Sequence, residues 1–154
     1  CRRCRRSGAA QWRAWNCVGH RRAAARTVVA RHCACLHNDV LDTGPGDRPA
    51  LSSGAVYVPD GMPPQGGWPV VSWAHGTVGM GDQCAPSNYK STERDSAYLA
   101  HWMQQGYAVV ATDYVGLGNP GVHPYLDGPA AARSVVDMVR AARTQVPQLS
   151  SEWR

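Results

Sequence analysis

Three short apolar runs, separated by segments rich in glycine and proline, dominate the hydrophobic pattern of this chain. They cover residues 55–58, 68–74 and 106–112, and each ends at a polar or turn-forming sequence. The last two runs are nearly continuous in apolar character, which is typical of strands buried on both faces. The pattern therefore predicts three strands, two of them fully buried.

Two further segments have the spacing of amphipathic helices. The first begins after Ser91 or Thr92, either of which can cap it, and Gly106 ends it. The second begins at Pro129, a residue suited to a first helical position, and Pro147 ends it. Strands that alternate with helices in this way predict an α/β fold with two helices and a mostly parallel sheet.

Charge and cysteine content divide the 154 residues near Asp39. Residues 1–38 hold nine arginines, no lysine and no acid, together with five of the six cysteines. Residues 39–154 hold seven basic against eleven acidic side chains, so the formal net charge of +5 comes from the first part alone. We expect residues 1–38 to be a disordered or non-native leader and residues 39–154 to carry the folded domain.

The leader also permits a different chemistry. Cys1 and Cys4 form one close pair, and Cys17 and His20 form a second, which is a spacing that zinc sites use. The surrounding arginines would favour phosphate, so a zinc- or nucleic-acid-binding element remains a hypothesis. However, the residues between the pairs lack the apolar periodicity that would pack beneath a metal, and this favours the disordered leader.

The sequence shows neither a membrane span nor a targeting segment. No run approaches the roughly 18 apolar residues that a transmembrane helix needs. The leader also lacks the uninterrupted apolar stretch of a signal peptide. Oligomeric state is not indicated by any pattern in the sequence.

The glycine-rich segment 116–121 has the spacing G-x-G-x-x-G, which is typical of dinucleotide-binding loops. Such a site requires a helix to open directly after the loop, and Pro120 and Pro124 prevent this. We therefore expect a loop that leaves a strand, and no cofactor.

The tripeptide His75-Gly76-Thr77 follows the second predicted strand, at the end where α/β folds place their sites. A turn of this kind can aim main-chain N–H groups at a reacting oxygen, as the oxyanion hole of acyl-transfer enzymes does. An ordinary tight turn with a hydrogen-bonded His75 is the alternative that the tripeptide alone leaves open.

A longer series of motifs in the same order resembles the secretory lipase family, the lipase A-like branch of the α/β-hydrolase superfamily. The resemblance covers roughly residues 50–154 and rests on five motifs in register, at residues 71–77, 84–87, 106–114, 116–118 and 123–126. It implies a secreted serine hydrolase that acts on acylglycerols and other carboxylic esters.

The resemblance also implies roles for individual residues. Thr77 would donate an oxyanion hydrogen bond through its main-chain N–H, and Gly76 would permit the turn. His75 would shape the loop, because the catalytic histidine of the family lies far downstream. Cys84 matches a position that in relatives forms a disulfide with a later cysteine, and no later cysteine exists here.

The nucleophile of this fold stands in a G-x-S-x-G elbow, and the acid and the histidine follow it. None of the ten serines has that context. In relatives the strand of the elbow begins just beyond the segment that matches residues 149–154. We therefore expect an incomplete α/β-hydrolase fold that is inactive alone. There are two narrower alternatives. One is another α/β-hydrolase activity. The other is a different triad, drawn from Ser72, His75, His101, His123, Asp113 and Asp127.

Overall fold

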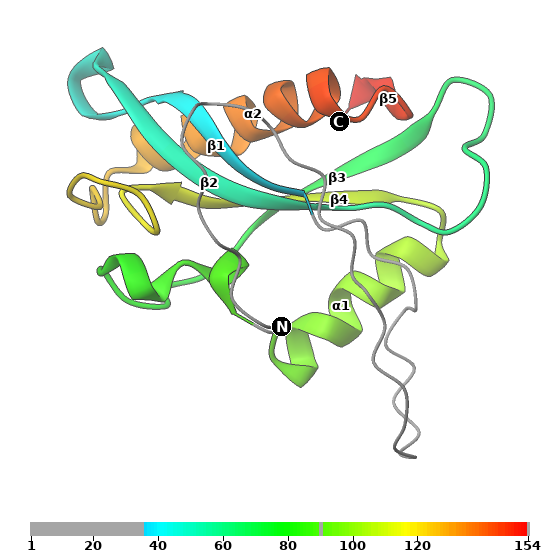
Figure 1. Cartoon of the computed structure of the whole chain (residues 1–154), viewed down its shortest axis with the longest axis horizontal. Coiled ribbons are helices and arrows are strands. Elements are labelled where there is room, and N and C mark those ends of the chain that lie inside the picture. The colour runs from blue at the N-terminus through cyan, green and yellow to red at the C-terminus, as the bar shows by residue number, and fades with distance from the viewer. Residues whose placement is uncertain (1–35, 90, 154) are drawn as a thin grey trace, which may run out of the picture.

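The computed structural model describes residues 36–89 and 91–153, with side chains for residues 42–89 and 91–151. Five strands form one sheet, and two α-helices pack against it (Figure 1). In chain order the elements are β1 (Leu36–Thr43), β2 (Pro49–Tyr57), β3 (Trp68–Ala74), α1 (Glu93–Gln104), β4 (Ala108–Val115), α2 (Gly128–Gln145) and β5 (Leu149–Trp153). Three short 3-10 turns lie at Pro45–Asp47, Asp82–Cys84 and Pro86–Asn88.

The strand order in the sheet is β1-β2-β4-β3-β5. β1 pairs antiparallel with β2, and β2 pairs antiparallel with β4, whereas β3 runs parallel to both β4 and β5. The short connection between β1 and β2 makes a hairpin, which must be antiparallel, while the helical connections allow parallel pairing. The α/β fold class is therefore confirmed, with a sheet that is mixed because of the added hairpin.

The two helices lie on opposite faces of the sheet (Figure 1). The chain steps from β3 through α1 to β4 in one direction, and from β4 through α2 to β5 in the other, past β3. Because parallel crossovers share one hand, steps in opposite directions place their helices on opposite faces. The connections that leave β3 and β4 thus diverge, and ligand sites of open α/β sheets lie at such a point.

Each α-helix begins with a side chain that caps it. The Thr92 side chain accepts a hydrogen bond from the Asp95 N–H at 3.1 Å, so Thr92 rather than Ser91 caps α1. The Asp127 side chain caps α2 by accepting from the Ala130 N–H at 3.0 Å. Each bond satisfies a main-chain donor that the helix itself leaves without a partner.

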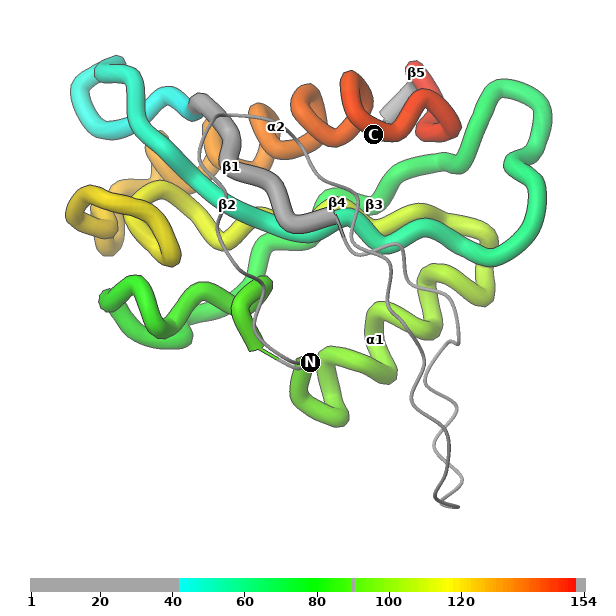
Figure 2. The backbone as a smooth tube through the Cα atoms, in the orientation of Figure 1, coloured from blue at the N-terminus to red at the C-terminus, as the bar shows by residue number. Residues whose placement is uncertain are grey.

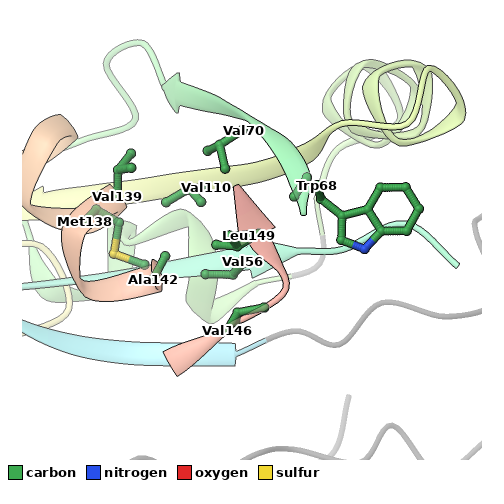
Figure 3. Close-up of a cluster of buried hydrophobic side chains, with 10 residues drawn as sticks. Val56, Trp68, Val70, Val110, Met138, Val139, Ala142, Val146 and Leu149 are labelled. Carbon is green, nitrogen blue, oxygen red and sulfur yellow. The ribbon is translucent and has the colours of Figure 1, made fainter. Parts of the chain in front are cut away.

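The main apolar core fills the space between the sheet and α2 (Figure 3). Met138 and Val139 of α2 are fully buried there, against Val56 of β2 and Val110 of β4. In contrast, Leu99 is the one buried residue of α1. The sheet is therefore anchored firmly on its α2 face. No helix in the described part of the chain is both long enough and apolar enough to span a membrane.

Candidate functional site

Two loops meet at the carboxyl ends of β3 and β4, although some 40 residues separate them in the sequence. In Figure 2 the green loop after β3 and the yellow loop after β4 lie at the same end of the sheet. A cavity of about 390 Å³ lies between them. Its lining includes His75, Gly76 and Thr77 from the first loop, and Leu117 and Tyr125 from the second. The structure thus places the predicted oxyanion turn at a cavity, at the divergence of the two connections.

The imidazole of His75 is hydrogen-bonded to the main chain of the same turn. Its Nδ1 lies 2.6 Å from the main-chain oxygen of Gly76, so Nδ1 must carry a proton and donate it. A peptide is planar and trans, so the N–H of Thr77 points away from the Gly76 oxygen. Among the residues that the structure describes, neither the Gly76 N–H nor the Thr77 N–H donates to another group. Both donors are therefore available to a ligand.

Tyr114, the next-to-last residue of β4, contacts the same turn from the other side. Its hydroxyl donates to the main-chain oxygen of His75 at 3.0 Å, and the two rings lie 4.6 Å apart between centroids. Burial raises the pKa of the Tyr114 phenol above its ordinary value, because the phenolate would lose its hydration. The hydroxyl therefore remains a donor throughout the neutral range.

The carboxylate of Asp113 is buried beneath the first loop, with 2% of the residue exposed. It accepts hydrogen bonds from the Ser53 hydroxyl at 2.7 Å, from the Ser87 N–H at 2.9 Å, and from the Ser87 hydroxyl. These bonds join β2, β4 and the 3-10 turn at Pro86–Asn88. Asp113 thus fixes the base of the site and does not line the cavity at the His75–Thr77 turn.

The second loop is held by His123. Its Nδ1 lies 2.8 Å from the main-chain oxygen of Val115, the last residue of β4. Gly116 and Gly118 both have φ in the left-handed region, at 71° and 75°. A side chain at Gly116 would also collide with the main chain of Val122 and His123, at 2.6–2.8 Å. The glycine-rich segment thus folds back on itself, and α2 begins only at Gly128.

The groups that could make a different triad are not assembled into one. The Ser72 hydroxyl donates to the main-chain oxygen of Val135 in α2, at 3.3 Å. The His75 Nε2 lies 3.4 Å from the main-chain oxygen of Asp113, not from its carboxylate. Among the side chains that the structure describes, residues 42–89 and 91–151, no serine hydroxyl is hydrogen-bonded to a histidine.

Cys84 lines a second cavity of about 310 Å³, on the α1 face of the sheet, together with Trp73 and Tyr89. It is half-buried and is a free thiol in the described part of the chain. The candidate zinc ligands Cys1, Cys4, Cys17 and His20 lie outside the described residues. Among those that are described, no group of three or more His, Cys, Asp or Glu side chains is arranged to hold a metal ion.

Sequence reasoning missed Tyr114 as a part of this site, and it considered Asp113 only as a member of a triad. The signal for Tyr114 was its place at the carboxyl end of a buried strand, beside the strand that leads to His75. This position could not identify the hydrogen-bond partner of the Tyr114 hydroxyl, because that partner is a main-chain oxygen, which any residue at position 75 would supply.

No protein-family model and no curated protein matches the chain. Among solved structures, the rice cell wall degrading esterase LipA from Xanthomonas oryzae is similar to it, with 26% sequence identity and a TM-score of 0.57. A ligand-bound form of the same esterase gives 27% identity and a TM-score of 0.56.

The similarity covers 80% of this chain but only 34–35% of the esterase chains. The chain thus spans about a third of the length of the structures that it matches. The part of those structures that matches this chain belongs to an esterase. This confirms the resemblance to the lipase and esterase family that the ordered motifs indicate.

Proposed function

We propose that this chain is the N-terminal part of a secreted serine carboxylic-ester hydrolase of the lipase or esterase type. In this proposal the main-chain N–H of Thr77 is one donor of the oxyanion hole, Gly76 permits the turn, and His75 shapes it. Secretion belongs to the proposal because the motifs resemble those of secretory lipases. The observation that carries the proposal is the Thr77 N–H at the cavity, which has no acceptor among the described residues, in a fold that is similar to an esterase.

The geometry suits the chemistry of acyl transfer. When a serine attacks an ester carbonyl, the carbonyl oxygen becomes an anion that fixed donors stabilise. The Thr77 N–H is fixed because the His75 imidazole holds the other end of the same peptide, at Gly76 O. The donor therefore does not need to reorient as charge develops.

A second part of the proposal concerns the catalytic serine, acid and histidine, which the motifs of this chain do not supply. None of the ten serines in this sequence stands in a G-x-S-x-G elbow. Among the histidines whose side chains the structure describes, His75 and His123 are bonded to main-chain oxygens and His101 is exposed. We therefore propose that residues 1–154 alone do not hydrolyse esters. The complete reaction would need a nucleophile, an acid and a catalytic histidine that the motifs of this chain do not supply.

The binding part is tested with the ¹⁵N-labelled chain and methyl butylphosphonate, a monoanion whose tetrahedral phosphorus imitates the intermediate of ester hydrolysis. We expect saturable shifts of the Thr77 and Gly76 amide signals, larger than those of any other amide. The neutral dimethyl ester of the same acid, which lacks the charge, should shift them much less. Equal response to both compounds, or no response of Thr77, would refute the oxyanion role.

The catalytic part is tested with p-nitrophenyl butyrate and a fluorophosphonate that labels activated serines. We expect no hydrolysis above that of the heat-unfolded chain, and no labelled serine. Hydrolysis that stops when one serine becomes labelled would show that the chain contains its own nucleophile, contrary to the proposal.

A further inference from the structure

We propose that Tyr114 is the positioning residue of the oxyanion turn, holding the His75–Gly76 peptide directly and the Gly76–Thr77 peptide through the His75 ring. This inference rests on the proposed role of the Thr77 N–H. It adds a residue from β4 whose function would be to set where two main-chain donors point.

The backbone of Tyr114 lies in the left-handed region, with φ of 69°. A bulky aromatic residue rarely adopts this conformation, because its Cβ crowds the main chain there. Such conformations persist only where neighbouring contacts impose them, and they gather at functional sites. The strain at Tyr114 therefore calls for a contact that needs this orientation of the side chain.

A β-bulge produces the orientation. Gly54 of β2 pairs with Thr112 of β4, but the preceding Ser53 pairs with Tyr114, so Asp113 is an extra residue in β4. Side chains alternate between the faces of a strand, so regular pairing would turn residue 114 to the face of Val110, toward α2. The bulge instead brings the Tyr114 ring onto His75.

The bulge is itself held by buried hydrogen bonds. The carboxylate of the extra residue, Asp113, is bound by Ser53 of the partner strand and by Ser87 of the loop that follows β3. Because Asp113 immediately precedes Tyr114, these bonds fix the main chain where the strain occurs. The hydrogen bonds of Asp113 thus impose the backbone conformation of Tyr114, and this conformation lets the Tyr114 side chain contact His75.

The contact acts on both peptides of the turn. The Tyr114 hydroxyl binds His75 O, so the Gly76 N–H, on the opposite side of that planar peptide, points away from the phenol. The Tyr114 ring packs on the imidazole whose Nδ1 binds Gly76 O. That second bond turns the Thr77 N–H away from the imidazole in the same manner. One residue therefore orients both available donors.

The test is the variant Tyr114→Phe, which keeps the ring and removes the hydroxyl, with Tyr98→Phe on the surface of α1 as the matched control. We expect Tyr114→Phe to shift the His75 carbonyl carbon signal and the Gly76 amide signal. We also expect the affinity of the Thr77 site for methyl butylphosphonate to fall by about 3- to 10-fold, the net effect of one hydrogen bond. Tyr98→Phe should change neither quantity.

The outcomes separate this inference from the proposed function. If wild-type Thr77 responds to the phosphonate and Tyr114→Phe binds it equally well, Tyr114 has no positioning role but the oxyanion turn stands. If wild-type Thr77 does not respond, the proposed function fails, and the inference fails with it.

A measurement on the wild-type chain covers the case in which the variant does not fold. Replacing the phenolic proton of Tyr114 by deuterium should shift the His75 carbonyl carbon signal, because the two are joined by the hydrogen bond. Absence of this isotope shift in the folded wild-type chain would overturn the inference without any variant.

Discussion

The hydroxyl of Ser53 in β2 donates a 2.7 Å hydrogen bond to the buried carboxylate of Asp113, which lies 60 residues further along the chain. Ser87 binds the same carboxylate through its N–H. Three distant segments thus meet at one buried side chain, and the next residue, Tyr114, contacts the proposed oxyanion turn. The stability of the site and its geometry should therefore depend on Asp113.

Replacing Asp113 by Asn should destabilise the chain. An amide offers one acceptor oxygen in place of two, so at least one of the donors from Ser53 and Ser87 would lose its partner while buried. The expected loss is about 1–3 kcal/mol in the free energy of unfolding, measured in urea. The exposed Asp82→Asn serves as control and should lose almost nothing. Equal stability of the two variants would show that the buried bonds of Asp113 are not stabilising.

Gly54 should not tolerate a side chain. A Cβ at this position would lie 2.3 Å from the main-chain oxygen of Ala111 and 2.9 Å from the Met138 sulfur. Because a sheet oxygen cannot move aside, we expect Gly54→Ala to cost about 1–3 kcal/mol or more in the free energy of unfolding. Gly128→Ala is the matched control, since nothing lies within 4 Å of its added carbon. A thermal midpoint that is unchanged by Gly54→Ala would contradict the packing of α2 on β2.

The cap of α1 can be tested by comparing two neighbouring residues. Thr92→Ala removes the side-chain acceptor of the Asp95 N–H and should cost about 1 kcal/mol. Ser91→Ala keeps that bond and should be nearly neutral. Amide hydrogen exchange in the first turn of α1 measures the difference locally. Faster exchange in Ser91→Ala than in Thr92→Ala would mean that the helix begins one residue earlier.

Asp42 should make stability depend on pH. Burial raises its pKa above the ordinary value of 3.8, and the nearby hydroxyls of Ser134 and Ser52 offset this only in part. The folded state therefore binds the proton more tightly than the unfolded state. This contribution to stability is fully present below about pH 3.8 and is lost as pH rises through the raised pKa.

The variant Asp42→Asn has no proton to lose at this position. Relative to wild type, it should gain stability as pH rises from about 4 towards 7, when both are measured by thermal unfolding. The neighbouring carboxylate of Asp137 acts in the same direction as burial, since it also disfavours a charged Asp42. A stability difference between the two proteins that is constant over this range would contradict a raised pKa of Asp42 in the folded state.

The strands and helices with strong local patterns could be predicted from the sequence. β3 coincides with the predicted residues 68–74, and α1 is capped by Thr92, one of the two residues that the sequence offers. α2 begins at Gly128, one residue before the predicted Pro129, and its cap Asp127 was not predicted. β1 and β5 could not be predicted, because both form through main-chain pairing and carry polar residues. Asp42 illustrates this, since a buried acid in a strand is contrary to any apolar pattern.

The candidate site could be predicted in outline but not in detail. His75, Gly76 and Thr77 were identifiable from their place after a buried strand and from the ordered motifs. The bulge at Asp113 and the strained backbone of Tyr114 were not, because both arise from a one-residue offset between β2 and β4. Such an offset depends on tertiary contacts such as Ser53 with Asp113, and no local spacing encodes it.

The most direct test of the account is the structure of the chain bound to methyl butylphosphonate. We predict a phosphonyl oxygen within about 2.7–3.1 Å of the Thr77 main-chain nitrogen, with the butyl group against Leu117 in the cavity between the two loops. An anion bound only at exposed arginines, or only in the cavity on the α1 face, would contradict the central claim that this turn is built to hold an oxyanion.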